Sequence, residues 1–392
     1  MSDDFLASAN KIKAELIARR RDFHRHPELG FEEERTSGIV ATELTRLGLE
    51  VQTGIAKTGV VGLLEGARPG PTVLLRFDMD ALPVQEANET DYVSTVPGKM
   101  HACGHDAHTA IGLAVVRIMA EHRSEIAGRL KFVFQPAEEG QGGAAAMIRE
   151  GVLENPKPDY ALGLHMWNAM EVGTVGVTPG SVMAGSDRFD CTITGAGGHG
   201  GLPHLSHDPL VAAGYVITAL QTIVARNINP LEAAVVTVAS LHAGEAFNAI
   251  PERVQLNGTI RTFKPEVRET VLRRTQEIIQ SVASGLGCAT EFSWEEVNPA
   301  LVNDANVTAE VHRAAEGIVG SEHVRSERMT GSEDFAFMLE RVPGCFFHVG
   351  SANAEKALNY PHHNPRFDFD ESALVLATAI MTSAAGRYVL SG

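Results

Sequence analysis

Cysteine is scarce in this sequence. The chain has four cysteines among 392 residues, far apart at Cys103, Cys191, Cys288 and Cys345. Small secreted folds that depend on disulfides carry their cysteines densely and at regular spacing. The chain is therefore outside that class, and at this length it buries enough surface to fold without cross-links.

Positive charge is also in short supply. Lys and Arg number 33 against 49 Asp and Glu, which gives a formal net charge of -16 at pH 7. Nucleic acids and anionic membrane surfaces are bound through basic patches. The charge balance therefore argues against both as main partners.

Long apolar runs are missing as well. No uninterrupted apolar stretch approaches the ~18 residues that cross a bilayer. The first residues, MSDDFLASANKIKAEL, are acidic and then amphipathic, whereas a secretory signal is positively charged and then apolar. We expect a soluble, cytoplasmic protein without a membrane partner.

The remaining composition is that of an ordinary globular protein with many histidines. Hydrophobic residues make up 44% and charged residues 21%, which excludes disordered and fibrous classes. At ~150 residues per domain, the length predicts two or three domains. The positions of the 16 histidines are the feature that carries functional information.

Strand and helix signals alternate along most of the chain. Apolar side chains recur at helical spacing through residues 4–47, with a turn at residues 26–30. Further on, the strand-like apolar runs are residues 71–77, 128–135, 159–167 and 344–350, and the helix-like stretches are residues 108–123 and 142–153. This alternation predicts an α/β fold, with helices on both faces of a sheet.

The pattern changes near residue 185. Residues 188–195 alternate like a half-exposed strand, and Asp208 and Pro209 open a helix as its N-cap and first residue. The later segments are strands at 233–244, 252–263 and 288–297 and a helix at 265–287. This order is the ferredoxin-like α+β unit, βαββαβ. We predict one discontinuous domain, residues 1–184 and 298–392, and an inserted domain, residues 185–297.

Candidate metal ligands gather in MHACGHDAHTA, residues 100–110. One glycine separates Cys103 from His105, so the backbone can fold until thiolate and imidazole face one ion. These two ligand types suit zinc and similar metals. For the pair alone, a helix N-terminus capped by Asp106 is the alternative, but the density of ligand-type residues favours a metal site.

Two adjacent glutamates, Glu138 and Glu139, lie between a strand-like run and a glycine-rich turn in QPAEEGQGG. Open α/β sheets bind ligands at the carboxyl ends of their strands. Because neighbouring side chains diverge, one glutamate can bind an ion while the other faces its water. The pair is a candidate base and ligand, and a solvated charge pair is the alternative.

Other strand ends deliver the same residue types. His165 ends a strand-like run, and Asp78 and Asp80 follow another, where they are suited to orienting ligating histidines. His362 and His363 lie in a proline-bounded loop near the C-terminus. A lone strand-end histidine such as His165 is more often structural, but the convergence of these residues predicts a metal centre.

Taken in order, the motifs resemble those of the metal-dependent amidohydrolase family that includes hippurate hydrolases, N-acyl-amino-acid aminoacylases and auxin-conjugate hydrolases, in the dinuclear metallopeptidase clan. The resemblance runs nearly end to end, through FHRHPELGFEE, RFDMDALP, MHACGHDAHTA, FQPAEEGQGGA, GLHMWN, GAGGHGGLPH, NAIPERVQLNGTIRTF, MTGSEDFAF and HNPRFDFDE. It implies a catalytic α/β/α sandwich with an inserted lid and dimerisation domain.

The resemblance implies a two-metal centre with a bridging cysteine. The implied ligands are Cys103, His105, Glu139, His165 and His363. Zinc fits this donor set best, with manganese, nickel and cobalt as alternatives. The roles of Asp78 and Asp80 stay open, because more distant peptidases of the clan carry histidine where this chain has Asp78.

The resemblance also implies the other roles. Glu138 would be the general base, and His199 would stabilise the oxyanion from across the interface of a homodimer or higher homo-oligomer. The implied substrate-binding residues are Asn248, Arg261, Gly331 and Ser332. From the residues alone, a turn role for His199 and a surface salt bridge for Arg261 are the ordinary alternatives.

The predicted activity is metal-dependent hydrolysis of the amide bond of small-molecule N-acyl amino acids, with N-acetyl or N-benzoyl (hippurate-like) groups. A dipeptidase or carboxypeptidase with the same centre is one alternative. A metal-dependent binding protein and an enzyme with Cys103 as nucleophile are two others. Glu138 argues against the binding protein, because a binding site needs no free carboxylate beside the metal.

Overall fold

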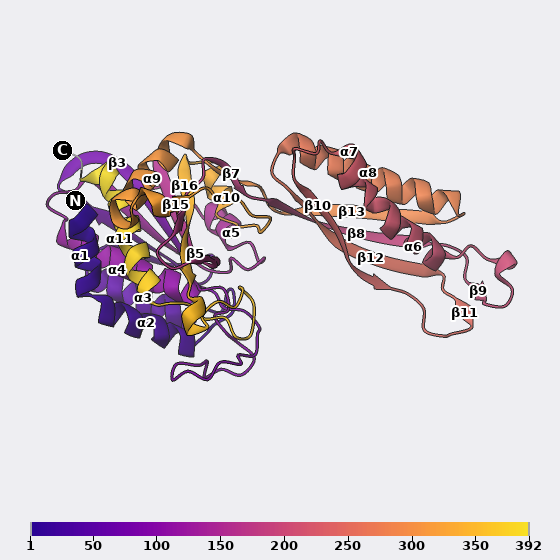
Figure 1. The fold of residues 1–392 in the computed structure, drawn as a ribbon, viewed down its shortest axis with the longest axis horizontal. Helices are drawn as coiled ribbons and strands as arrows, with labels where there is room; N and C mark the ends of the chain where they lie inside the picture. Colours follow the sequence, from indigo (N-terminus) through magenta and orange to yellow (C-terminus); the bar gives the residue numbers. More distant parts are fainter. Residues whose placement is uncertain (1, 391–392) are drawn as a thin grey trace. The chain divides into compact units, whose positions relative to one another are not determined.

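The chain folds into two compact units in a computed structural model that describes residues 2–390 (Figure 1). The first unit comprises Met1–Gly180, Val302–Arg328 and Asp334–Gly392, and the second comprises Ser181–Leu301 and Met329–Glu333. The insertion expected at residues 185–297 falls within the second unit. The short segment Met329–Glu333, assigned to the first domain from the sequence, also joins the second unit.

An eight-stranded mixed sheet forms the centre of the first unit. In sheet order, its strands are β1 (Glu50–Ile55), β2 (Gly59–Glu65), β4 (Ala127–Gln135), β3 (Arg68–Asp78), β5 (Tyr160–Glu171), β16 (Gly344–Ala352), β6 (Val175–Gly176) and β15 (Val324–Arg325). The central strands β4, β3, β5 and β16 are parallel, while β1 and β2 are antiparallel additions at one edge. The four central strands are those predicted from apolar runs, whereas β1 and β2 were not predicted.

Helices pack around this sheet. The helices of the first unit are α1 (Ser2–Lys11), α2 (Lys13–Arg25), α3 (Glu34–Arg46), α4 (His105–Glu121), α5 (Gly143–Arg149), α9 (Ala305–Val319), α10 (Ala336–Leu339) and α11 (Ser372–Val389), with 3-10 turns at η2 (Ser321–His323) and η3 (Ala354–Lys356). Helix α5 is shorter than the predicted helix at 142–153, because Gly151 has a φ of 86°, which an α-helix cannot continue.

Helix α4 is packed closely against the sheet. Its residues are nearly all buried from His105 to Met119. Gly112 allows this close approach, since a Cβ there would lie 2.7 Å from the Phe77 ring and 2.8 Å from the Phe134 ring. We expect even one added methyl group at Gly112 to cost about 1–3 kcal/mol of stability through overpacking.

Helix α11 is long and apolar enough, by length and composition alone, to cross a membrane. It is instead a core helix, because 78% of that stretch is buried within the protein. It packs against α4 and against β3, β5 and β16. Among residues 2–390, no other helix meets the same length and composition test.

The second unit has the ferredoxin-like order. Its elements are β8 (Gly185–Thr194), β9 (Gly198–His199), η1 (Pro203–Leu205), α6 (Pro209–Leu220), α7 (Thr222–Asn227), β10 (Ala234–His242), β11 (Ala249–Ile250), β12 (Arg253–Thr262), α8 (Pro265–Gly285) and β13 (Ala289–Asn298). Its sheet has the order β10-β12-β8-β13 and is antiparallel throughout. The short strands β7 (Gly180–Met183) and β14 (Leu301–Asn303) lie where the chain passes between the units. The predicted fold class is confirmed.

Helix α6 begins as its sequence predicts. The Asp208 side chain accepts hydrogen bonds from the backbone N–H groups of Leu210 and Val211, and Pro209 is the first helical residue. The buried face of this helix packs with α8 over the sheet. Its opposite face leaves Leu210, Val211 and Tyr215 exposed by 42%, 50% and 62%.

Candidate metal centre

The register of the parallel strands lines up chemical groups across the first unit. Asp78 at the end of β3 pairs with Gln135 at the end of β4. Gly163 of β5 pairs with Arg76 of β3, so His165 lies at the level of Asp78. The glutamates that follow Gln135 therefore lie at the same edge of the sheet as His165.

The first turn of α4 supplies two more residues at this edge. Gly104 is the N-cap and has a left-handed φ of 89°, a conformation open to glycine at little cost. The turn that it makes separates Cys103 from His105, and both side chains are buried. Cys103 Sγ lies 3.6 Å from His165 Nε2.

Hydrogen bonds fix which nitrogen each of these histidines presents. His105 Nδ1 donates to the Asp80 carbonyl oxygen at 2.9 Å, and His165 Nδ1 donates to the Met166 carbonyl oxygen at 2.7 Å. In the neutral form of each ring, Nε2 is thus the acceptor. Burial opposes protonation of His105, but Asp78 and Asp80 raise its pKa well above the usual value, so a metal ion at Nε2 would displace a proton. His105 Nε2 is buried without a hydrogen-bond partner, as expected for an atom that ligates a metal.

The last two predicted ligands meet at the same place. His363 Nε2 lies 3.2 Å from Glu139 Oε1, and the His363 backbone N–H donates to the Ala102 carbonyl oxygen at 2.8 Å. The neighbouring His362 does not compete for this position. Its Nε2 donates to the Met166 carbonyl oxygen at 2.9 Å, and its ring stacks on Trp167.

Two sets of donor atoms overlap at Cys103. The ligand atoms of Cys103, His105 and His165 lie within 4.8 Å of one another, and so do those of Cys103, Glu139 and His363. A third set joins His105 with both glutamates. The five predicted ligands are thus brought together, with the thiol in the shared position, and this donor set fits divalent ions that accept sulfur and nitrogen ligands.

The pKa values of the buried His165 and Cys103 side chains are compatible with metal binding. Burial lowers the pKa of His165 well below its usual value, so the ring is neutral. Burial and the nearby Glu139 raise the pKa of the Cys103 thiol well above its usual value. A thiol with a raised pKa is a poor free nucleophile, which argues against a cysteine hydrolase, and it ionises beside a bound cation.

Both carboxylate oxygens of Asp78 accept hydrogen bonds from side chains. Its Oδ2 accepts from Arg76 Nη1 at 2.6 Å, and its Oδ1 accepts from His108 Nδ1 at 2.6 Å. Although Asp78, His105 and His108 also have donor atoms within 4.8 Å of one another, both Asp78 oxygens are engaged by these partners. Burial opposes ionisation, but His105, Arg76 and His108 together hold the pKa of Asp78 well below its usual value.

Asp80 links two predicted ligands. Its Oδ1 lies 3.2 Å from His105 Nδ1, and its Oδ2 accepts from the Glu139 backbone N–H at 3.0 Å. One carboxylate therefore orients both the imidazole and the loop of the two glutamates. Glu138 is buried beside them, and its Oε1 lies 3.4 Å from the backbone nitrogen of Asp334.

The predicted residues of the second unit form two separate groups. His199 pairs with Ala249 in the β9–β11 ladder, and the Gly200 N–H donates to the Asn248 carbonyl oxygen. At the other group, Arg261 Nη1 lies 3.4 Å from Ser332 Oγ, beside Gly331.

The length of strand β12 gives the separation of these two groups. Strand β11 comes just before Arg253, the first residue of β12, whereas Arg261 is the last residue but one of β12. The eight successive residue steps from Arg253 to Arg261 span ~26 Å at ~3.3 Å each. Figure 1 shows β9 and β11 beyond one end of the four-stranded sheet. Within one second unit, His199 and Arg261 therefore cannot reach the same small molecule.

His199 is nevertheless prepared as a hydrogen-bond donor. Its Nδ1 accepts from the Gly201 backbone N–H at 3.0 Å. The proton of the neutral ring is therefore on Nε2, and the side chain is exposed.

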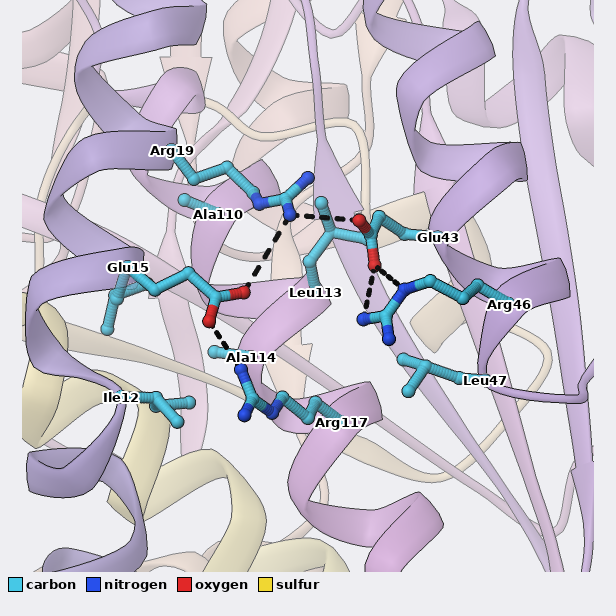
Figure 2. A pocket seen from close by; sticks show the side chains of 11 residues that line it. Ile12, Glu15, Arg19, Glu43, Arg46, Leu47, Ala110, Leu113, Ala114 and Arg117 are labelled. Atoms are coloured by element: carbon cyan, nitrogen blue, oxygen red, sulfur yellow. Dashed lines mark hydrogen bonds and ion pairs between the residues drawn. The ribbon is translucent and has the colours of Figure 1, made fainter.

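A small cavity elsewhere in the first unit does not belong to the site. It lies between α2, α3 and α4 and is crossed by ion pairs of Glu15 with Arg117 and of Arg19 with Glu43 (Figure 2). Its volume is about 20 Å³. That is room for one water molecule and excludes a substrate.

Comparison with known proteins identifies the family of this centre. The model of peptidase family M20/M25/M40 matches residues 74–387, which include every predicted ligand. The chain belongs to this family. It is therefore a hydrolase of amide bonds.

Curated relatives in the M20 family match almost the whole chain. An N-acetylcysteine deacetylase of Bacillus subtilis is 39% identical over 93% of this chain and 94% of its own length. An indole-3-acetic acid (IAA)-amino acid hydrolase of Arabidopsis thaliana is 40% identical over 96% of this chain and 87% of its own length. A thermostable carboxypeptidase of Saccharolobus solfataricus is 38% identical over 93% of both chains.

A solved structure supports both the fold and the kind of centre. The dinuclear metal-binding M20 peptidase YxeP of Bacillus subtilis aligns with a TM-score of 0.83 and 33% identity, over 96% of this chain and 98% of that chain. Together with the donor sets of the first unit, this match supports divalent metal ions as the cofactor of this M20 chain.

Sequence reasoning assigned no role to the residues that hold Asp78 and Asp106. Arg76 and His108 hold Asp78, and Arg20 binds Asp106, the residue after His105. His108 carried a weak signal, since it is one helical turn after His105. Nothing in the pattern of the two arginines distinguishes them from surface residues.

Proposed function

We propose that this M20 chain hydrolyses the amide bond of N-acyl amino acids, with N-acetyl and N-benzoyl amino acids as its substrate class. The observation that carries the proposal is the pair of donor sets that share Cys103, with the buried Glu138 beside them. Divalent ions at such a site supply a water that is nucleophilic at neutral pH and polarise the scissile carbonyl group. Zinc suits the thiolate and imidazole donors best.

Glu138 is proposed as the general base and acid. It would take a proton from the attacking water and return it to the leaving nitrogen. Glu139, the adjacent residue, diverges toward His363 and would serve as a ligand instead. The two roles, proton transfer and metal binding, require two carboxylates with different surroundings. The loop after β4 provides them.

The second unit is proposed to contribute the remaining groups. Arg261 would pair with the free carboxylate of the substrate, because a guanidinium group binds a carboxylate through two parallel hydrogen bonds. Asn248, Gly331 and Ser332 would complete the binding residues. His199 would donate its Nε2 proton to the oxyanion.

We propose a homodimer, in which His199 and Asn248 act in the site of the partner. Two observations support it: His199, in the separate two-stranded β9–β11 sheet, lies beyond the end of β12 that is opposite to Arg261, and α6 carries an exposed apolar face on the same unit. Isologous pairing of two copies would provide every group at each of two sites.

We also propose a cytoplasmic location. The four cysteines are free and buried, as is usual for proteins of the reducing cytoplasm.

A carboxypeptidase or dipeptidase is the second candidate, because a carboxypeptidase is among the relatives at 38% identity. The test is a panel of acetylated amino acids, benzoyl-glycine and dipeptides, assayed on protein reconstituted with zinc, manganese or cobalt. Turnover of the acylated compounds at much higher kcat/KM than the dipeptides is expected. The reverse order would transfer the proposal to the peptidase, and no turnover of either class would contradict it.

A further inference from the structure

An arginine lies fully buried behind the metal centre. Arg20 of α2 is 0% exposed, and its guanidinium group meets three carboxylates. Its Nε donates to Asp106 Oδ2 at 2.9 Å, and its Nη2 donates to Asp368 Oδ1 at 3.0 Å. Its Nη1 lies 3.4 Å from Glu371 Oε1. Burial of a charged guanidinium group costs free energy unless its partners are held in place around it. These hydrogen bonds therefore fix the three carboxylates relative to one another.

The first two carboxylates belong to the two segments that carry predicted ligands, the first turn of α4 and the loop of His363. Asp106 follows His105 directly and also accepts from the Ala107 backbone N–H at 2.9 Å, which ties it to the first turn of α4. Asp368 lies in the loop of His363. The backbone of that loop is anchored again by Asn168 Nδ2, which donates to the Asp368 carbonyl oxygen at 2.7 Å.

The ligands on these loops are joined directly by one backbone hydrogen bond, from the His363 N–H to the Ala102 carbonyl oxygen. His363 also has a φ of 65°, which a residue with a side chain adopts only when its surroundings impose it. The bridge Asp106–Arg20–Asp368 is a side-chain connection between the two segments, and it lies beside His24, which is hydrogen-bonded to Asp106, and Tyr92, which donates to Asp368.

We infer that Arg20 is a positioning residue that sets the spacing between the Cys103–His105 turn and the His363 loop. It thereby sets the affinity for the second metal ion, the one that Cys103, Glu139 and His363 would hold. The inference rests on the proposed two-metal centre. A planar guanidinium group can donate to two carboxylates in fixed directions, whereas a lysine ammonium group of the same charge has no such fork. Geometry, rather than charge, is what Arg20 supplies.

The test is titration of the metal-free protein with Co²⁺, followed by calorimetry and by the absorption of the cobalt–thiolate bond. Wild-type protein is expected to take up two ions per chain. Arg20→Lys is expected to bind the first ion normally and the second ~10–100-fold more weakly, the usual loss when a group that orients ligands is removed.

Arg21 provides a matched control. It is the next residue of α2 and donates to Glu371 at 2.7 Å, but none of its hydrogen bonds reaches Asp106 or Asp368. Arg21→Lys is therefore expected to titrate like wild type. Asp368→Asn keeps the shape of the side chain and should weaken the second ion as Arg20→Lys does, and it provides the same readout if the arginine variant fails to fold.

The outcomes separate this inference from the proposed function. Two ions bound with wild-type affinity by both Arg20→Lys and Asp368→Asn, or equal weakening of both ions, would overturn the inference and leave the metal centre standing. Weakening by Arg21→Lys as large as that by Arg20→Lys would overturn it too. Uptake of fewer than two ions by wild type would overturn the metal centre, and the inference with it.

Discussion

The two units of this M20 chain hold their candidate residues in opposite ways. In the first unit the predicted ligands Cys103, His105 and His165 are buried, and a network of carboxylates and arginines surrounds them. In the second unit His199 is exposed in the two-stranded β9–β11 sheet, whereas Arg261 is half-buried near the far end of β12. We infer from this contrast that the first unit is built to hold metal ions, and we propose that the second unit presents His199 to a partner copy.

Substitution of Glu138 tests the first unit most severely. Glu138→Gln keeps the size of the side chain but cannot accept the proton, so kcat should fall by roughly 10²–10⁴-fold. Metal content measured by elemental analysis should stay at the wild-type value. Glu139→Gln is the matched comparison and should lose metal as well as activity. Unchanged turnover in Glu138→Gln would exclude it as the base.

Substitution of His199 tests the second unit. His199→Ala removes the proposed oxyanion donor, and kcat should fall by ~10²–10³-fold with little change in KM. The same substitution at His204, an exposed histidine of the same unit, serves as the control. Steady-state kinetics of the two variants test whether His199 has a specific role in the reaction. Equal losses of kcat at both positions would indicate a structural effect instead.

The arginine of the second unit should affect binding more than chemistry. Arg261→Met removes a charge-assisted hydrogen bond worth about 1.5–3 kcal/mol, so KM should rise by roughly 10–100-fold while kcat changes less. Arg273, on the exposed face of α8, is paired with Glu277 and provides a control substitution to Met. A fall in kcat at constant KM for Arg261→Met would remove it from carboxylate binding.

The smallest effect is expected at the cavity of Figure 2. Arg117→Met breaks the ion pair with Glu15, which is partly exposed, and should change the free energy of unfolding by about 1 kcal/mol or less. Kinetic constants should not move. A change in kcat or KM here would mean that this region, and not only the metal centre, takes part in the reaction of the first unit.

The sequence predicted the parts of the fold that have strong local signals. Strands β3, β4, β5 and β16 are uninterrupted apolar runs, and the N-cap at Asp208 follows from two adjacent residues. Strand β1 was missed because EVQTGI is mostly exposed and polar, and β6 and β15 are two residues long. The transfer of Met329–Glu333 to the second unit has no local signal, since it depends on which unit the chain packs against.

In the candidate site, too, residues with a local sequence signal could be predicted and residues without one could not. The ligands could be proposed because cysteine, histidine and paired glutamates at strand ends are unusual. Arg20 and Arg76 could not, because a buried arginine looks like a surface one until its carboxylate partners, such as Asp368, are placed beside it by the fold. For Asp78, the sequence left the role open, and the contacts with Arg76 and His108 favour a supporting role over a ligand role.

Subunit mixing tests most directly the claim that the first unit holds the chemistry and the second unit serves a partner copy. Glu138→Gln and His199→Ala proteins, each nearly inactive, are unfolded together, refolded as a mixture and assayed with an N-acyl amino acid. Because each mixed dimer regains one intact site, activity should recover to about a quarter of wild type for random pairing. A mixture that stays as inactive as its components would contradict the account.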